Sequence, residues 1–167
     1  MGKDILKLAN RLGQVSESKR LHITTAESCT GGGIAAAITE VPGSSNWFEY
    51  GFVTYANRAK MDLLGVTAES LQRFGAVSRE VVEQMAAGAL AAAGADLAVA
   101  ASGIAGPDGG SADKPVGTVW LAWAHRGAYP RAKQYLFQGN RGEIRAQAVE
   151  AALAGLIAMA EGDKPPP

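Results

Sequence analysis

Apolar residues near the start of the chain recur at the spacing of an α-helix and then give way to a short continuous run. Ile5, Leu8, Ala9 and Leu12 lie one to four residues apart on one face, which predicts an amphipathic helix to about residue 18. The β-branched and apolar stretch that follows, residues 21–26, predicts a strand. A polar elbow then leads through three glycines into an alanine-rich helix, so the chain begins with the order helix, strand, helix.

The middle of the chain repeats the step from strand to helix. The aromatic and β-branched run from Phe52 to Tyr55 predicts a strand. The segment after it predicts a helix that Asn57 caps and that ends at Gly65. Strand and helix therefore alternate again.

Two further helices and three strands complete the pattern. Thr67 caps a short helix, and Ser78 begins a longer helix that ends at Gly94. The remaining predicted elements are strands at 96–106, 116–124 and 132–137 and a closing helix at 141–160.

This order of elements predicts the fold class. Helices that alternate with about five strands predict an α/β protein, specifically a three-layer α/β/α sandwich. The last strands follow one another without a helix, so we expect a hairpin and a mixed, mostly parallel sheet. No linker divides the chain, which predicts a single domain over residues 1–160 and a disordered, proline-rich tail over 161–167. Ligands of such sheets settle in the loops at the strand ends.

Composition limits the classes of function. Sixteen basic residues balance sixteen acidic ones, so no net field recruits nucleic acid or an anionic membrane. Cys29 is the one cysteine of the 167 residues, which excludes an internal disulfide and a Cys-rich zinc site; we expect neither metal nor cofactor. The chain has no signal-peptide pattern and no membrane-spanning apolar window, which predicts a cytoplasmic protein. The long alanine-rich helix could pack against a second copy in a homo-oligomer.

The first of three loops that could carry chemistry follows the first strand. Glu27, Ser28 and Thr30 precede Gly31 and Gly32 at a predicted helix start, where free N–H groups and the positive helix end attract an anion. Glycines at this place also serve simply to cap a helix and let it pack closely on a strand. The sequence leaves both interpretations open.

Cys29 lies in the same loop and has two interpretations of its own. A thiol at a helix N-terminus can have a lowered pKa and act as a nucleophile. A lone cysteine is more often a small buried apolar residue.

The second loop follows the third predicted strand. Glycines there let the backbone approach a ligand, and a serine adds a hydroxyl at the strand end. We expect four residues to form part of a pocket wall: Ser102, Gly103, Ala105 and Gly106. The rest of this loop, to Lys114, has the composition of an ordinary surface loop.

The third loop brings Ser44 and Ser45 close in sequence to Tyr55 and Lys60. A serine hydroxyl needs a base, and neither histidine of the chain accompanies a G-x-S-x-G elbow. A lysine with a lowered pKa can replace histidine, and Tyr55 could relay the proton. We therefore expect the serine, Tyr55 and Lys60 to meet at one strand end. The alternative is a half-buried tyrosine and a solvated lysine without a catalytic role.

Four blocks in the order in which they occur resemble one family closely: 24–32 (TTAESCTGG), 42–60 (PGSSNWFEYGFVTYANRAK), 75–78 (GAVS) and 102–120 (SGIAGPDGGSADKPVGTVW). The family is the C-terminal domain of the competence/damage-inducible protein CinA, which also occurs alone as a nicotinamide mononucleotide (NMN) deamidase. The resemblance implies a three-layer α/β/α fold and hydrolysis of the NMN carboxamide to nicotinic acid mononucleotide and ammonia without a metal.

The resemblance also implies roles for individual residues. Ser45 matches the proposed nucleophile, Tyr55 and Lys60 match its supporting pair, and Arg141 resembles an arginine placed near the substrate. The phosphate would lie against Arg141 or against the glycine-rich helix start, and Glu27 could hold ribose hydroxyls. Two alternatives stay open: a Cys29 nucleophile, and a non-catalytic nucleotide-binding module that acts through protein partners.

Overall fold

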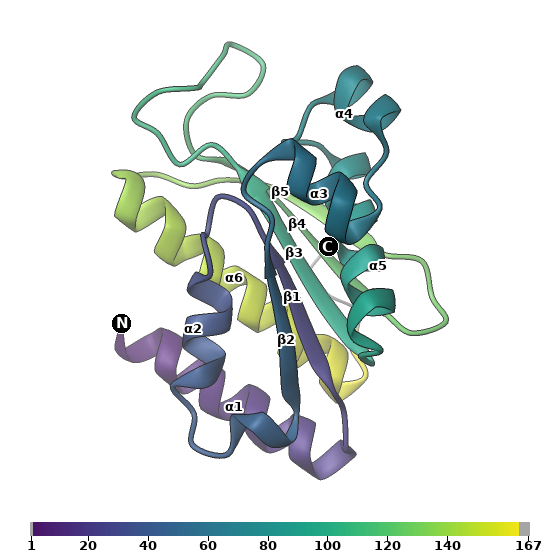
Figure 1. Ribbon diagram of the computed structural model, residues 1–167. Helices are drawn as coiled ribbons and strands as arrows, with labels where there is room; N and C mark the ends of the chain where they lie inside the picture. Colours follow the sequence, from purple (N-terminus) through teal and green to yellow (C-terminus); the bar gives the residue numbers. More distant parts are fainter. Residues whose placement is uncertain (1, 164–167) are drawn as a thin grey trace.

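A five-stranded sheet forms the centre of the computed structural model, which describes residues 2–163 (Figure 1). The strands are β1 (Ile23–Glu27), β2 (Phe48–Val53), β3 (Leu97–Gly103), β4 (Thr118–His125) and β5 (Arg131–Leu136). Their order across the sheet is β2-β1-β3-β4-β5. β1 pairs in parallel with β2 and β3, and β4 pairs antiparallel with β3 and β5. Only β4 therefore runs against the others, and the prediction of a mixed, mostly parallel sheet is confirmed.

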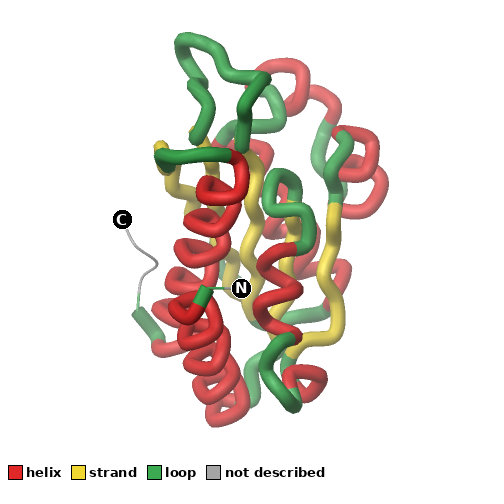
Figure 2. Tube along the Cα trace, turned by 90° about the vertical axis from the view of Figure 1, so that its left-hand side faces the viewer, coloured by secondary structure: helices red, strands yellow, loops and turns green. Residues whose placement is uncertain are grey.

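Helices cover both faces of the sheet. One layer contains α1 (Lys3–Lys19), α2 (Gly33–Thr39) and α6 (Arg141–Glu161), which lie in front of the sheet in Figure 2. The opposite layer contains α3 (Asn57–Leu64), α4 (Ala68–Phe74) and α5 (Arg79–Ala93). The three-layer α/β/α sandwich is thus confirmed.

The central strand β3 divides its side chains between two cores. Leu97, Val99 and Ala101 pack in the core beneath α1, α2 and α6, whereas Ala98 and Ala100 pack in the core beneath α5. Successive strand residues point to opposite faces, and both faces of β3 are covered. The continuous run of small apolar residues in the sequence reflects this double burial.

Some boundaries differ from the predicted ones. β2 begins at Phe48 and ends at Val53, so Tyr55 follows the strand instead of ending it. The N-cap of α3 is Ala56, with no side-chain cap, because Asn57 is already the first helical residue. α6 continues through Glu161, so the first residue of the predicted tail is helical, and 164–167 lie outside the described residues.

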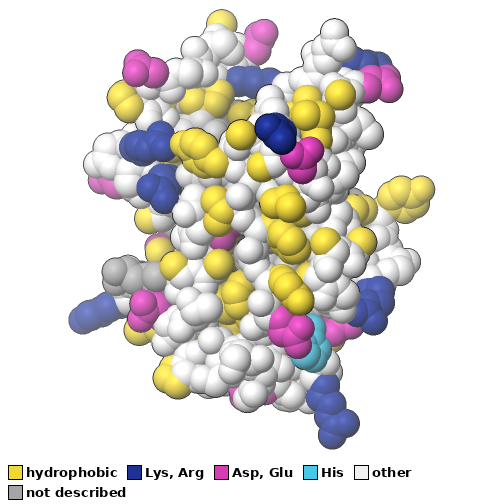
Figure 3. Space-filling view, in the orientation of Figure 1, with side chains coloured by type: hydrophobic (Ala, Val, Ile, Leu, Met, Phe, Trp, Pro, Cys, Tyr) yellow, Lys and Arg dark blue, Asp and Glu magenta, His cyan; other side chains and the backbone are white. Residues whose placement is uncertain are grey.

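β2 is an edge strand whose outer side carries exposed apolar side chains (Figure 3). Tyr50, Val53 and Tyr55 are each more than half exposed, as is Leu63 of α3. Association with a second copy of the chain stays a prediction. Within residues 2–163, no helix combines the length and the apolar character that crossing a membrane requires.

The absence of a side chain at Gly88 allows α5 to pack closely against the end of α3. A Cβ atom at this position would overlap the backbone carbonyl of Leu64, the last residue of α3. We expect Gly88→Ala to lower the free energy of unfolding by roughly 1–3 kcal/mol, because backbone cannot yield as a flexible side chain can. Urea denaturation measures this loss. The exposed neighbour supplies the control: Ala87→Ser should cost no more than about 0.7 kcal/mol, and equal losses in the two variants would contradict the packing role of Gly88.

Candidate active site

The carboxyl ends of β1, β2 and β3 meet at one edge of the sheet, the upper edge in Figure 1. Glu27, the last residue of β1, pairs with the neighbouring strand on each side. Its partners are Val53 of β2 and Ala101 of β3. The next residue along each of the three strands carries a hydroxyl group, and together these residues form a row across the sheet: Thr54, Ser28 and Ser102. All three are buried. Strand alternation directs Ser28 and Ser102 toward the helical layer of α3 and α5.

Lys60 of α3 reaches into this row from above. Its Nζ lies 3.1 Å from Oγ of Ser28, 2.8 Å from the carbonyl oxygen of Thr54 and 3.3 Å from that of Tyr55. The side chain is only 1% exposed. Burial disfavours the ammonium form and lowers the pKa of Lys60 from its ordinary value of 10.5, an effect that the Cys29 thiol opposes.

Three oxygen atoms around Nζ match the three N–H groups of an ammonium, and an uncharged amine can make the same three contacts if the Ser28 hydroxyl donates. A neutral lysine has two N–H groups and one lone pair. The carbonyls of Thr54 and Tyr55 can accept the two N–H groups, which leaves the lone pair for the Ser28 hydroxyl. Ser28 and Lys60 therefore have the geometry of a nucleophile and its general base.

The loop after Ser28 presents two backbone donors. Among residues 2–163, no protein oxygen accepts a hydrogen bond from the N–H groups of Cys29 and Thr30. The next N–H along, that of Gly31, donates to the Ser28 carbonyl at 3.0 Å. Free N–H groups directly after a nucleophilic serine are the usual source of an oxyanion hole.

Glu27 has a structural role. Its buried carboxylate accepts hydrogen bonds from the N–H groups of Gly32, Ile34 and Ala35 at 2.8–3.1 Å, and so caps the start of α2. These donors are no longer free for a phosphate, and the N–H of Gly31 is engaged as well. The predicted anion site at Gly31 and Gly32 and the predicted ribose contact of Glu27 are therefore wrong.

Cys29 is buried, with 6% of its surface exposed. Burial raises the pKa of its thiol to about 11, against an opposing effect from its own backbone N–H. A nucleophilic Cys29 would need a lowered pKa, so this interpretation is wrong: with the raised pKa the thiol is protonated at neutral pH.

We expect Cys29→Ala to retain activity within about threefold of the unmodified chain, since the thiol offers no thiolate at neutral pH. Iodoacetamide should alkylate Cys29 slowly at pH 7 and faster as the pH approaches 11. Loss of turnover in Cys29→Ala, with the melting temperature unchanged, would contradict this assignment.

Tyr55 and Arg141 form the rim of the site. Nη2 of Arg141 donates to the Tyr55 hydroxyl at 3.1 Å, and Nη1 donates to the Gly106 carbonyl at 2.8 Å. The structure therefore brings together the tyrosine, the arginine and the second glycine-rich loop. No hydrogen bond joins the Tyr55 phenol to Lys60; Lys60 contacts the Tyr55 backbone instead.

The second glycine-rich loop contributes differently at each predicted residue. Ser102 lies beside Ser28 and its hydroxyl makes no hydrogen bond to residues 2–163, so it is free for a ligand. Gly103 and Gly106 allow close packing, because Cβ atoms there would overlap Val119 and Val116. Ala105 is buried in the core.

Ser44 and Ser45 lie at the other end of the sheet. They belong to a 3-10 turn, Ser44–Asn46, before the first residue of β2, whereas Tyr55 and Lys60 follow its last residue. Six strand residues span about 20 Å. The expected meeting of Ser45 with Tyr55 and Lys60 is therefore wrong within this chain: Ser45 is exposed, and Ser44 is buried beneath the turn.

Fold and site together define the class of this protein. Residues 5–160 match the model of the CinA C-terminal domain, and the chain belongs to that family. Nicotinamide-nucleotide amidohydrolase PncC of Pseudomonas putida is 56% identical over 155 residues, covering 93% of this chain and 96% of its own. The protein of the same name from Escherichia coli K12 is 51% identical over 153 residues, 92% of this chain and 93% of its own.

Solved structures agree with these matches. The crystal structure of competence/damage inducible protein CihA from Agrobacterium tumefaciens superposes with a TM-score of 0.93 at 49% identity. It covers 95% of this chain and 97% of its own. The sequence interpretation left Ser28 among the substrate contacts and did not consider it as the nucleophile. The signal that could have found Ser28 is a serine directly after a buried strand and before a glycine-rich helix start.

Proposed function

We propose that this protein hydrolyses the carboxamide of NMN to nicotinic acid mononucleotide and ammonia, a step of pyridine-nucleotide recycling. The observation that carries the proposal is the contact between Ser28 Oγ and the buried Lys60 amine, since it pairs a nucleophile with a base of lowered pKa. The printed names of the Pseudomonas putida and Escherichia coli relatives supply the substrate.

In the first step, Ser28 Oγ attacks the carboxamide carbon while neutral Lys60 takes the hydroxyl proton. The C–N bond is still intact, and the carbonyl oxygen becomes an oxyanion. The N–H groups of Cys29 and Thr30 stabilise this oxyanion, a contribution of roughly 3–4 kcal/mol per donor in comparable sites. The Lys60 ammonium then returns its proton to the leaving nitrogen, and ammonia departs.

In the second step, water hydrolyses the acyl-enzyme. Lys60 is neutral again and takes a proton from the water, whose oxygen attacks the same carbon. The Ser28 ester bond breaks, and the proton passes to Oγ. The product leaves as the carboxylate, its remaining proton passes to solvent, and the enzyme returns to its starting state. No cofactor enters this scheme, and its donors and proton carriers are residues of the chain.

The rim supports binding of the rest of the nucleotide. Arg141 reaches over the site and has no carboxylate partner among residues 2–163, so it can bind the 5′-phosphate by charge-assisted hydrogen bonds. Tyr55, 60% exposed, offers an aromatic face beside it. Ser102 lies next to Ser28 on the side away from Thr54 and can accept or donate to the pyridine carboxamide.

Ammonia release from NMN, nicotinamide riboside and nicotinamide, measured side by side, tests this function. We expect turnover of NMN and at least about 100-fold lower kcat/KM without the phosphate. Equal turnover of nicotinamide would contradict the nucleotide assignment. A binding module without catalysis would bind NMN and release no ammonia at any protein concentration.

A further inference from the structure

Arg145 carries a half-buried guanidinium for which the described residues supply no carboxylate. It lies one turn after Arg141 on α6, and none of the ion pairs among residues 2–163 includes it. Its Nη2 donates to the Thr30 carbonyl at 2.8 Å. Its Nε is fully buried and has no acceptor. A buried N–H group without an acceptor destabilises the fold, so its presence calls for an explanation.

The hydrogen bond of Arg145 fixes the loop that carries the two free N–H groups. The peptide between Thr30 and Gly31 is held at both ends: its carbonyl accepts from Arg145 and from the Gly33 N–H, and its N–H donates to the Ser28 carbonyl. The torsions of Thr30 are thereby restrained, and with them the direction of its N–H.

Gly31 leaves the space that the guanidinium fills. Its φ is +58°, and a Cβ there would lie 3.1 Å from Nη2 of Arg145. A side chain at this position would therefore strain the left-handed backbone and press against the guanidinium. The charge also acts on an anion in this loop: it lowers the pKa of the Cys29 thiol, against the larger opposing effects of burial and of the Glu27 carboxylate.

We propose that Arg145 is a positioning residue of the reaction centre. By holding the Thr30–Gly31 peptide it aims the N–H groups of Cys29 and Thr30 at the oxyanion, and its positive charge stabilises the charge that develops there. This inference rests on the proposed function of Ser28. A direct contact of Arg145 with the substrate phosphate is the competing role, which the buried Nε and the engaged Nη2 disfavour.

Steady-state kinetics of Arg145→Met and Arg145→Lys with NMN separate the two roles. We expect kcat to fall roughly 100-fold in Arg145→Met, with KM within about twofold, because a small displacement of the donors affects the transition state more than the ground state. Arg145→Lys or added guanidinium ion should restore part of kcat.

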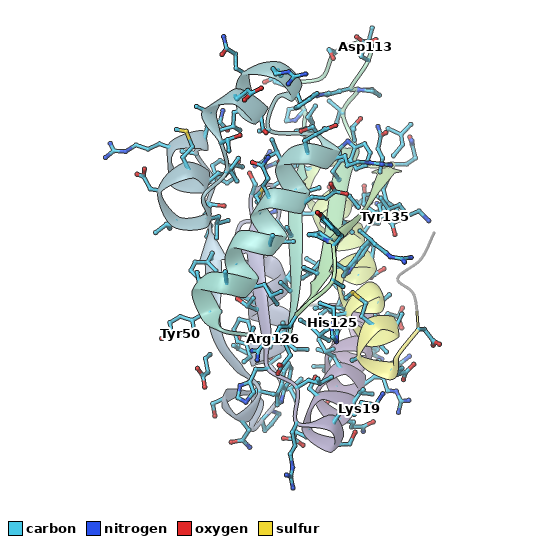
Figure 4. The ribbon with its side chains drawn as sticks, turned by 90° about the vertical axis from the view of Figure 1, so that its right-hand side faces the viewer. Lys19, Tyr50, Asp113, His125, Arg126 and Tyr135 are labelled. Atoms are coloured by element: carbon cyan, nitrogen blue, oxygen red, sulfur yellow. The ribbon has the colours of Figure 1, made fainter. Side chains whose placement is uncertain are left out.

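Arg126→Met is the matched control. Arg126 also donates to loop carbonyls, those of Gly94 and Ala95 at 2.6 and 3.0 Å. It lies toward the opposite end of the sheet from the loop that contains Asp113 (Figure 4). We expect Arg126→Met to change the melting temperature and leave kcat unaltered. A raised KM at unchanged kcat in Arg145→Met, or a kcat that falls only in proportion to the folded fraction, would overturn the positioning role.

A fluorophosphonate probe tests the same inference without NMN. Ser28 Oγ forms a bond to phosphorus, the P–F bond breaks, fluoride leaves, and Lys60 takes the hydroxyl proton. We expect labelling at Ser28 to be about 100-fold slower in Arg145→Met. If Arg145→Met slows labelling but the unmodified chain releases no ammonia from NMN, the assignment of NMN as the substrate is wrong and the positioning role of Arg145 stands. Equal labelling rates in variant and unmodified chain, or no labelling of the unmodified chain, would overturn the role of Arg145.

Discussion

Replacing Ser28 by alanine should lower kcat for NMN by roughly 10⁴-fold or more, as loss of the nucleophile does in serine hydrolases. The remaining rate would come from the free N–H groups and from substrate binding, which the substitution leaves in place. KM should change little. A continuous ammonia assay at saturating NMN measures the effect.

Ser45→Ala is the matched control for this result. Ser45 is exposed in the turn before β2, and Ser28 is buried beside the Lys60 amine, so the two serines differ in the base available to them. We expect Ser45→Ala to retain kcat within about twofold. Full activity in Ser28→Ala together with an inactive, folded Ser45→Ala would refute the Ser28 mechanism.

Lys60→Met should lower kcat by roughly 10³-fold or more, because Ser28 then lacks a base and the leaving nitrogen lacks a proton donor. In the proposed mechanism, the active form of the unmodified chain has a neutral Lys60. The value of kcat/KM should therefore rise with pH through the lowered pKa of Lys60 and reach a plateau below pH 10.5. A profile that falls with pH in this range would contradict the role of the neutral amine.

The same substitution should change the pH dependence of stability. Burial lowers the pKa of Lys60 in the folded state, so the unfolded chain binds more protons between that pKa and 10.5. The free energy of unfolding therefore rises with pH across this window through the contribution of Lys60. Lys60→Met removes that contribution, which urea denaturation at several pH values can measure.

The Ser28–Lys60 contact shows where prediction from sequence succeeds and where it ends. The apolar run of β3 and the strand after α1 predict the buried layer, because burial on two faces requires continuous small apolar residues. Lys60 can act as a base only if burial lowers its pKa. The sequence alone instead favours a solvated lysine at that position of the helix. The burial comes from the packing of α3 against α5, which Gly88 permits.

Ser45 and Ser28 illustrate the same limit from the other side. Ser45 is nearer to Lys60 in sequence, but β2 separates the two by the height of the sheet. Ser28 is 32 positions from Lys60 and yet contacts it, because parallel pairing of β1 with β2 places both carboxyl ends at one edge. Residues at opposite ends of one strand are therefore far apart in space, whereas residues that follow the same ends of two paired parallel strands lie close together.

The sequence by itself determined the order of helices and strands, the three-layer sandwich and the family, because periodicity, capping residues and four motif blocks are local features of the chain. The tertiary structure alone decided which serine faces Lys60, that Glu27 caps α2, that Cys29 is buried, and that Arg145 holds the Thr30 carbonyl. Each of these depends on groups that lie far apart in the chain. Their protonation and their hydrogen bonds follow from burial, which no single segment of the sequence specifies.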